Sequence, residues 1–306
     1  MKLIGAALSR TGTMSLMTAL EGLGLRCYHM KECLLNTFKG RGDLDRWLKV
    51  FTLDPGCEER LELLRQIYRG YDACCDTPSC FVYQELAALF PEAPVLLTRR
   101  NAARWRKSFA DSVYRAHKIL NGPLAPLCVL IFQGLYRLPF LRVFGVMGII
   151  AKDEKMIMGP FFTDDGMLDF ESEADAQEIE SRFTAWIATV EKSIPEGRLL
   201  SIEPPYEDAY RIICTALNLP VPERPYPHVN DSEDLRKAIG IFRVLFYAIP
   251  AVSVATVLGT LAAALFSGAA LLFIGCAGAF LLLLYGLQAL LLAIVRGLGK
   301  RDNSPP

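Results

Sequence analysis

The tightest limit on the fold comes from the last quarter of the chain, where two stretches are apolar for longer than a soluble helix needs. Residues 244–266 and 269–295 contain no residue that would be costly in hydrocarbon except Gln288. Each stretch exceeds the roughly 20 residues that a membrane-spanning helix requires, and neither has the polar face of a soluble amphipathic helix. Because only Ser267 and Gly268 separate them, we predict a two-helix transmembrane hairpin.

Basic residues flank both outer ends of the predicted spans, whereas the turn between the spans carries no charge. The flanking residues are Arg236, Lys237 and Arg243 before the first span and Arg296, Lys300 and Arg301 after the second. Since the cytoplasmic flanks of membrane spans are enriched in Lys and Arg, both ends are expected in the cytoplasm. The predicted organisation is a cytoplasmic domain over residues 1–238, a membrane hairpin over 239–298 and a cytoplasmic tail over 299–306.

The charge balance and the cysteine pattern limit which partners and metals this protein is expected to bind. Lys plus Arg and Asp plus Glu each total 33, so no excess of positive charge points to nucleic acid. The nine cysteines contain no CxxC pair, and the three histidines are not spaced to complete a zinc site. We therefore expect reduced thiols in a protein that faces the cytosol, and no bound metal.

Ahead of the apolar end, short apolar runs alternate with helical patterns. Predicted strands cover residues 3–8, 25–30, 71–75, 95–98 and 199–202. Predicted helices cover residues 13–23, 44–51, 58–68, 79–90, 102–119, 174–193 and 207–217. Such alternation is typical of an α/β fold whose strands pair in parallel through right-handed crossovers.

Two segments fall outside this alternation. Residues 123–150 are apolar but interrupted by Pro, Arg137 and Arg142, which leaves two interpretations open: a half-buried helical cap, or a segment that lies in the membrane interface. Residues 219–231 are rich in Pro, which biases its neighbours away from the helical region. An extended path is therefore expected there.

The turn after the first predicted strand has the chemistry of an anion site. The sequence Ser-Arg-Thr-Gly-Thr leads into a helix whose first N–H groups have no partners inside the helix, and these groups together with the helix dipole favour an anion. Gly12 allows close backbone approach, and Arg10 offers a planar fork of donors suited to phosphate or sulfate oxygens. Hydroxyl donors are available from Thr11, Thr13 and Ser15.

Two common nucleotide motifs are absent from this turn. A P-loop of the form GxxxxGK[ST] would have a lysine after Gly12, but Thr13 stands there, and a GxGxxG loop is excluded because Gly5 and Gly12 are isolated. These absences count against NTP hydrolysis and against dinucleotide binding. Taken alone, the segment is also compatible with a plain strand–helix turn that binds no ligand.

A second anion-binding segment follows a later strand. Arg100 comes directly after the predicted strand 95–98, and Ser108 stands eight positions further on, in the following helix. In a parallel sheet Arg100 would lie at the carboxyl edge, where α/β folds bind their ligands. Ser108 would present its hydroxyl to the same anion.

With both anion segments in place, the chain resembles the sulfotransferase family, and more narrowly its divergent sulfotransferase-like branch. The resemblance rests on LSRTGTMSL at residues 8–16, CYHM at 27–30, the Arg and Ser within 97–108, and PYPHVND at 225–231. It spans about residues 1–235. It implies a three-layer parallel sheet of the P-loop nucleotide-kinase type, and transfer of a sulfuryl group from 3'-phosphoadenosine 5'-phosphosulfate (PAPS) to a hydroxyl or amine without a metal.

The family pattern also implies which residues bind the donor. In that family an Arg or Lys followed by Ser/Thr-Gly-Thr binds the 5'-phosphosulfate, and a later Arg and Ser pair binds the 3'-phosphate. The residues implied here are Arg10, Thr11, Gly12, Thr13, Met14 and Ser15 for the first group, and Arg100 and Ser108 for the second.

Sulfuryl transfer to a hydroxyl also requires a base for the proton and a cation for the charge on the leaving phosphate. Arg10 is the predicted cation. Where cytosolic family members have the histidine of a His-x-Pro element, this chain departs from the pattern with Asp76-Thr77-Pro78. Asp76 is the candidate base if burial or a partner raises its pKa, although it would equally suit a helix cap. His29 is the second candidate base, with a structural role as its alternative.

Three further residues receive weaker assignments. His228 either closes over the nucleotide or lies on the surface, and His117 is expected to be exposed. Trp105 is interpreted as a core aromatic residue rather than as a stacking partner for adenine.

The leading prediction is a membrane-anchored sulfotransferase that faces the cytosol and acts on a small-molecule or lipid acceptor. The apolar segment 123–150 would form the acceptor pocket. The main alternative is a membrane protein that retains the nucleotide-binding fold without activity, since the family histidine is missing. A P-loop kinase or NTPase is the second alternative, against which the missing lysine counts.

Overall fold

A computed structural model describes residues 1–136, 159–163, 166–229 and 232–267, together with positions 282, 286, 289 and 293. Its centre is a five-stranded sheet in the order β2-β3-β1-β4-β7, in which every neighbouring pair is parallel. The strands are β1 (Leu3–Gly5), β2 (Cys27–Tyr28), β3 (Ala73–Cys74), β4 (Val95–Thr98) and β7 (Leu199–Ile202). All five predicted strands are confirmed, and the first three are shorter than predicted.

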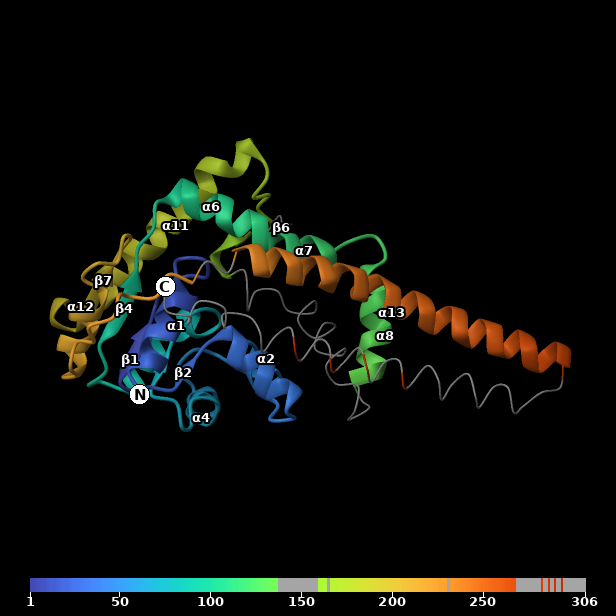
Figure 1. Ribbon diagram of the computed structural model, residues 1–306, viewed down its shortest axis with the longest axis horizontal. Coiled ribbons are helices and arrows are strands. Elements are labelled where there is room, and N and C mark those ends of the chain that lie inside the picture. The colour runs from blue at the N-terminus through green and yellow to red at the C-terminus, as the bar shows by residue number, and fades with distance from the viewer. Residues whose placement is uncertain are drawn as a thin grey trace.

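Helices cover both faces of the sheet, because successive strand residues point to opposite sides. Leu3 packs in one core cluster with Leu16 and Ile213, whereas Ile4 packs in the other with Trp47 and Leu64. The helices on the first face are α1 (Thr13–Gly22) and α12 (Ala209–Leu217); those on the second are α3 (Asp43–Thr52), α4 (Glu58–Ile67), α5 (Tyr83–Leu89) and α11 (Glu173–Ser193). The predicted α/β fold with three layers is visible in Figure 1.

Three helical segments differ from the sequence expectation. No helix is predicted at α2 (Met30–Phe38), because its N-cap is His29 and not one of the residues that strongly favour caps. The predicted helix 79–90 is a 3₁₀ turn η1 (Ser79–Val82) followed by α5. The predicted helix 102–119 consists of α6 (Ala102–Phe109), a π-helical turn η2 (Ala110–Tyr114) and α7 (Arg115–Leu120). Such π turns are local insertions in an α-helix.

Smaller elements complete the described part of the domain. They are α8 (Ala125–Tyr136), η4 (Gly159–Phe161), the antiparallel pair β5 (Phe162–Thr163) and β6 (Gly166–Met167), and η5 (Glu196–Arg198). α8 occupies the start of the apolar segment 123–150, whose remainder lies outside the described residues. Residues 218–229 contain no helix or strand, in line with the extended path predicted for the Pro-rich segment.

The helix α13 (Ser232–Ser267) projects away from the sheet (Figure 1). Its stretch Leu235–Thr256 is long and apolar enough to cross a membrane, by length and composition, and it is one such helix in the described part of the chain. The predicted second span 269–295 lies outside the described residues apart from isolated positions, as does the tail 299–306. The two-helix hairpin is therefore not confirmed.

The first half of α13 is docked on the domain and does not stand free of it. Phe246 is fully buried, and Tyr247 Oη donates a hydrogen bond to the carbonyl oxygen of Ile119 at 3.0 Å. The helix is continuous across residues 238 and 239, where the sequence analysis places a domain boundary. That boundary stays a prediction, but the helix joins the two parts through one rigid element.

Candidate active site

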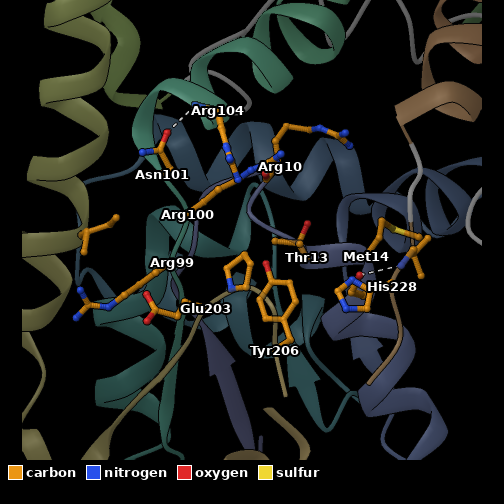
Figure 2. A pocket seen from close by; sticks show the side chains of 15 residues that line it. Arg10, Thr13, Met14, Arg99, Arg100, Asn101, Arg104, Glu203, Tyr206 and His228 are labelled. Atoms are coloured by element: carbon orange, nitrogen blue, oxygen red, sulfur yellow. Dashed lines mark hydrogen bonds between the residues drawn. The ribbon is translucent and has the colours of Figure 1, made fainter. Parts of the chain in front are cut away.

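The carboxyl ends of all five sheet strands supply residues to the candidate site, as expected for a parallel sheet. His29 follows β2, Asp76 follows β3, the turn at Gly12 follows β1, Arg100 follows β4, and Tyr206 follows β7. Because β1 lies between β3 and β4 in the sheet, its turn has one neighbour on each side. Figure 2 shows the side toward β4 and β7.

Gly12 forms the turn between β1 and α1 and adopts a positive φ of 99°. A Cβ atom there would lie 2.7 Å from Tyr206 Oη, and this hydroxyl donates to the Thr11 carbonyl at 3.0 Å. Tyr206 thus holds the turn in place, and glycine leaves the space for it. The N-terminus of α1 has no side-chain cap and no acidic residue in its first turn, so its N–H groups are suited to an anion.

Arg10, Arg100 and Ser108 meet beside this turn. Arg100 Nη1 donates to the Arg10 carbonyl oxygen, and Arg10 Nε donates to Ser108 Oγ at 3.3 Å. Arg10 itself has a φ of 69°, a left-handed conformation that costs a non-glycine residue about 1–2 kcal/mol and that tends to persist at functional sites. The two anion segments predicted from sequence therefore meet at Arg10, through its carbonyl oxygen and its guanidinium.

Two adjoining cavities open around these arginines and share Arg10, Arg100 and Arg104 in their walls. The loop cavity, of about 830 Å³, is lined by the Gly12 turn, the first turn of α1 and the segments after β4 and β7. The cationic cavity, of about 290 Å³, is lined by Arg10, Arg100, Arg104, Lys107 and Arg236, with Ser108, Ser112 and Asp111.

The charge in the cationic cavity is unbalanced. Its one carboxylate, Asp111, already pairs with Arg115 at 3.4 Å. In the described part of the chain, no acidic side chain forms an ion pair with Arg104, Lys107 or Arg236. Clustered positive charges in a concave wall raise the local concentration of anions, so the cavity is suited to a phosphate or sulfate.

Arg99 and Arg100 are adjacent in sequence but point in different directions (Figure 2). Arg99 Nη2 pairs with Glu191, and its Nε donates to Ser201 Oγ at 2.8 Å. Arg100 instead reaches the carbonyl oxygen of Arg10. Arg100 is therefore the member of this pair that faces the Gly12 turn.

On the β3 side of the turn, Asp76 is the centre of a buried hydrogen-bonded group, the carboxylate cluster of Ser9, Thr13, His29, Asp76 and Thr77. Asp76 Oδ1 accepts hydrogen bonds from Ser9 Oγ at 2.6 Å and from Thr13 Oγ1 at 3.3 Å. Asp76 Oδ2 lies 3.2 Å from His29 Nε2. Asp76 and His29 are each 6% exposed, so the cluster is nearly closed to solvent.

The hydrogen bonds of His29 fix its role in this cluster. Its Nδ1 accepts from the backbone N–H of Lys31 at 3.2 Å. The proton therefore resides on Nε2, which donates to Asp76. In this tautomer His29 orients the carboxylate and has no nitrogen available to accept a proton.

The cysteines of the described residues are thiols, and one of them, Cys75, donates to the Thr13 carbonyl at 3.5 Å. Eight cysteines in the described part of the chain are free, in line with the expectation of reduced thiols. Burial raises the pKa of Cys33 and of Cys74 to about 12, so both stay as uncharged thiols at neutral pH. Over the same described residues, no three His, Cys, Asp or Glu side chains gather in an arrangement that could hold a metal ion.

Comparison with known proteins places this arrangement in a family. Residues 2–235 match the family described as the sulfotransferase domain. The chain belongs to the sulfotransferase domain family. It is also similar to Ava biosynthesis cluster protein M of Aspergillus versicolor, with 28% identity over 236 residues, which is 76% of this chain and 82% of that relative. The parallel sheet of this sulfotransferase-domain protein fits that family, and the match ends just inside α13.

Most donor-binding residues predicted for this sulfotransferase domain lie together. The loop cavity is lined by Arg10, Gly12, Thr13, Met14, Ser15 and Arg100, and the cationic cavity by Ser108. Ser15 Oγ accepts from the N–H of Val229 at 3.0 Å. Thr11 differs, because it is 1% exposed and donates to the Leu8 carbonyl at 2.7 Å. Its hydroxyl closes the turn and does not face either cavity.

The weaker assignments have mixed outcomes. Trp105 is fully buried and stacks on Phe183 at 4.3 Å, so the core interpretation is confirmed and adenine stacking is excluded. His228 is an exposed residue at the edge of the loop cavity. His117 is only partly exposed, because it stacks on Tyr114. The Asp76 side chain does not cap η1, whose N-cap is Pro78 without a side-chain hydrogen bond.

Four residues of this site escape the sequence analysis: Ser9, Arg104, Lys107 and Tyr206. The sequence carries a signal for two of them. Arg104 and Lys107 stand at helical spacing with Ser108, so the three residues share the face of α6 that looks toward Arg100. Tyr206 reaches the Gly12 turn from the loop after β7, a contact across 195 positions. Nothing local in the sequence marks such a contact.

Proposed function

We propose that this chain is a membrane-anchored sulfotransferase that uses PAPS as its donor and whose active site faces the cytosol. The observation that carries the proposal is the meeting of Arg10, Arg100 and Ser108 around a cationic cavity, beside the uncapped N-terminus of α1. A nucleotide with phosphate groups at both ends of its ribose matches two neighbouring anion sites.

The residues fit the two anionic ends of PAPS, which supplies the activated sulfuryl group when bound. Arg100 and Ser108 would hold the 3'-phosphate in the cationic cavity. The Gly12 turn and the first N–H groups of α1 would hold the 5'-phosphosulfate. The loop cavity between them, at about 830 Å³, is within the usual range for small-molecule sites.

Asp76 is the residue proposed to accept the proton of the acceptor. His29 Nε2 and Ser9 Oγ both donate to its carboxylate, so the orientation of Asp76 is fixed before an acceptor arrives. We assign His29 and Ser9 as positioning residues. Arg10 offsets the negative charge that develops on the leaving phosphate.

Membrane attachment is assigned to α13. Its stretch Leu235–Thr256 has the required length and composition, and the basic residues Arg236, Lys237 and Arg243 near its start support a domain on the cytoplasmic side under the positive-inside rule. An active site held at a bilayer suits a lipophilic small molecule or a lipid as acceptor. The further apolar stretch 269–295 would form a second span.

Binding of 3'-phosphoadenosine 5'-phosphate (PAP) tests the donor site. PAP should raise the melting temperature of the full chain in detergent, because a ligand at 100 times its Kd stabilises the folded state by about 2.7 kcal/mol. Arg100→Ala should weaken PAP binding by about 1.5–3 kcal/mol, the range for hydrogen bonds to charged groups. Arg211→Ala is the matched control, because Arg211 is two-thirds exposed and pairs within α12 with Asp208. Stabilisation by ATP but not by PAP would show that the proposal is wrong.

A second candidate function is supported by the closure of the carboxylate cluster. Both oxygens of Asp76 already accept hydrogen bonds from protein groups, and the residue is 6% exposed. Such an arrangement also suits a nucleotide-binding membrane protein without catalytic activity. PAP binding without any consumption of PAPS, in the presence of lipophilic alcohols and membrane lipids, would favour this candidate.

A further inference from the structure

A third cavity lies between α13 and the connection from α7 to α8, and it shares Arg236 with the cationic cavity. This helix cavity has a volume of about 910 Å³. Its charged lining consists of Arg115, Lys118, Arg236 and Arg243 with one carboxylate, Glu171. Apolar side chains from α13 and from the α7–α8 connection complete the lining.

One face of α13 forms a wall of this cavity. Arg236, Gly240, Arg243 and Tyr247 line it and recur at helical spacing, so the two arginines are about 10 Å apart along the axis. They lie in the first turns of the candidate membrane stretch Leu235–Thr256. The helix cavity therefore sits where a bilayer surface would meet the domain.

The opposite wall is fixed to α13 by a specific contact. Tyr247 Oη donates to the Ile119 carbonyl at 3.0 Å. A Cβ atom on Gly122 would lie 2.4 Å from the same hydroxyl, so glycine permits the close approach. This contact holds α13 against the connection from α7 to α8 and so forms the cavity.

Two of the four cations form ion pairs, and the other two form none with any residue that the structure describes. Lys118 pairs with Glu171 at 2.6 Å, and Arg115 pairs with Asp111 at 3.4 Å. Throughout the described part of the chain, no acidic side chain comes within 4 Å of Arg243 or of Arg236 to form an ion pair. The face of α13 that lines the cavity therefore favours a negatively charged occupant.

Apolar side chains project outward next to these cations. Leu124, just before α8, and Leu127 and Leu130 within it recur at every third position and are 61%, 52% and 66% exposed. Val244 of α13 is 64% exposed. Meanwhile Cys128, on the other face of α8, is buried. Exposed leucines beside unpaired arginines are the pattern of a surface that enters the boundary between lipid headgroups and acyl chains.

We propose that the helix cavity binds the headgroup of an anionic phospholipid, with its phosphate at Arg236 and Arg243 and its acyl chains along the exposed leucines of α8. Basic pockets on the cytoplasmic side of membrane helices are suited to such headgroups. The proposal rests on the membrane placement of α13 within the proposed function. It does not depend on PAPS binding or on catalysis.

The test uses the full chain in a non-ionic detergent and soluble dioctanoyl lipids as probes. Dioctanoyl phosphatidylserine should raise the melting temperature and bind with a lower Kd than dioctanoyl phosphatidylcholine. Arg243→Gln should raise the Kd for phosphatidylserine about fivefold, because each basic residue near an anionic lipid surface contributes about 1 kcal/mol to binding. Arg211→Gln removes the same charge from a remote exposed helix and should leave that Kd unchanged. Any melting shift from inorganic phosphate should be the same in Arg243→Gln as in the parent chain, because phosphate is expected in the cationic cavity, which Arg243 does not line, and cannot use the leucines.

Several results would overturn the proposal. Equal affinity for the two lipids, equal effects of Arg243→Gln and Arg211→Gln, or a phosphate-induced shift that Arg243→Gln abolishes together with lipid binding would each do so. Leu127→Ser with Leu130→Ser is a second variant that spares the fold, since both side chains are more than half exposed. If it dissolves a dimer of the chain without changing lipid affinity, the leucines serve self-association instead. PAP binding by Arg243→Gln should match the parent chain, and loss of PAP binding with lipid binding intact would count against the donor site alone.

Discussion

The two sides of the Gly12 turn differ in how their charged side chains are compensated. On the β4 side, Arg104 and Lys107 line a cavity without ion-pair partners in the described part of the chain. On the β3 side, Asp76 and His29 are 6% exposed and hydrogen-bond to each other within the protein. The positive charge on the β4 side therefore favours binding of an anion. The other side is satisfied by its own residues and so fixes a carboxylate in place.

This contrast has an energetic basis. A buried carboxylate is tolerated when several donors replace the water it has lost, and Asp76 has Ser9, Thr13 and His29. Clustered arginines in an open cavity keep much of their hydration and need no such closure. Changes on the β3 side should therefore affect chemistry and folding together, whereas changes on the β4 side should affect ligand affinity.

Asp76→Asn should produce the largest effect of any single change. An amide cannot take up the acceptor's proton, so turnover of PAPS to PAP with 1-octanol as acceptor should fall by about 10²–10⁴-fold, the usual contribution of a general base. PAP affinity, read from the melting shift, should stay within a factor of about two, since no charge is lost from the cationic cavity. Asp72→Asn alters a carboxylate that pairs with Lys2 at the opposite end of β3, and should leave turnover unchanged.

His29→Asn separates the two members of the buried pair. Asparagine retains an acceptor for the Lys31 N–H, and thus the cap of α2, but it is too short to replace the imidazole against Asp76. A positioning residue should lower turnover by less than Asp76→Asn does. If His29→Asn removes all turnover while Asp76→Asn leaves most of it, the assignment of the base is reversed.

Gly12→Ala should have the second largest effect, because it places a side chain on the boundary between the two sides. The new Cβ would meet Tyr206 Oη at 2.7 Å in a residue with φ of 99°. We expect a loss of about 2–5 kcal/mol in unfolding free energy, from backbone strain of about 1–2 kcal/mol and overpacking of about 1–3 kcal/mol. PAP affinity should fall with it. Chemical unfolding and PAP titration of the same sample measure both.

Gly24→Ala is the matched control for strain without contact. Gly24 also has a positive φ, of 82°, but nothing lies within 4 Å of its would-be Cβ. It should lose about 1–2 kcal/mol of stability and keep its affinity for PAP. Tyr206→Phe in the Gly12→Ala background should recover part of the loss, because it removes the atom that clashes. No recovery would mean that strain alone accounts for the effect.

The β4 and β3 sides of the Gly12 turn also differ in how far the sequence predicts them. The sequence reveals Arg10 and Arg100 because each stands just after a strand end that a short apolar run marks, and Ser108 because it stands eight positions after Arg100. The pairing of His29 with Asp76 depends on β2 lying next to β3 in the sheet. Strand order is a tertiary property, so the two residues appeared in the sequence as competing candidates and not as partners.

Long-range contacts account for most of the remaining differences. Tyr206 supports the Gly12 turn from a loop 195 positions away, and Tyr247 ties α13 to α7 through the Ile119 carbonyl. Apolar composition alone marked α13 as a free membrane helix, since hydropathy does not distinguish lipid from a protein neighbour. The docking of its first half required the structure.

Ser15→Ala should produce the smallest of these effects. It tests how much one hydrogen bond beside the loop cavity contributes to stability and to PAP affinity. Ser15 Oγ accepts the N–H of Val229 at 3.0 Å, which holds the segment bearing His228 against the loop cavity. Its loss should cost about 0.5–1.5 kcal/mol, the net value of a neutral hydrogen bond, and PAP affinity should fall only two- to tenfold. Thr18→Ala removes a hydroxyl from the same helix that bonds only within it, to the Met14 carbonyl at 2.9 Å, and should leave PAP affinity unchanged. If Ser15→Ala lowered the unfolding free energy as much as Gly12→Ala does, the hydrogen bonds beside the loop cavity would hold the structure as strongly as those of the carboxylate cluster. The contrast between the two sides would then fail.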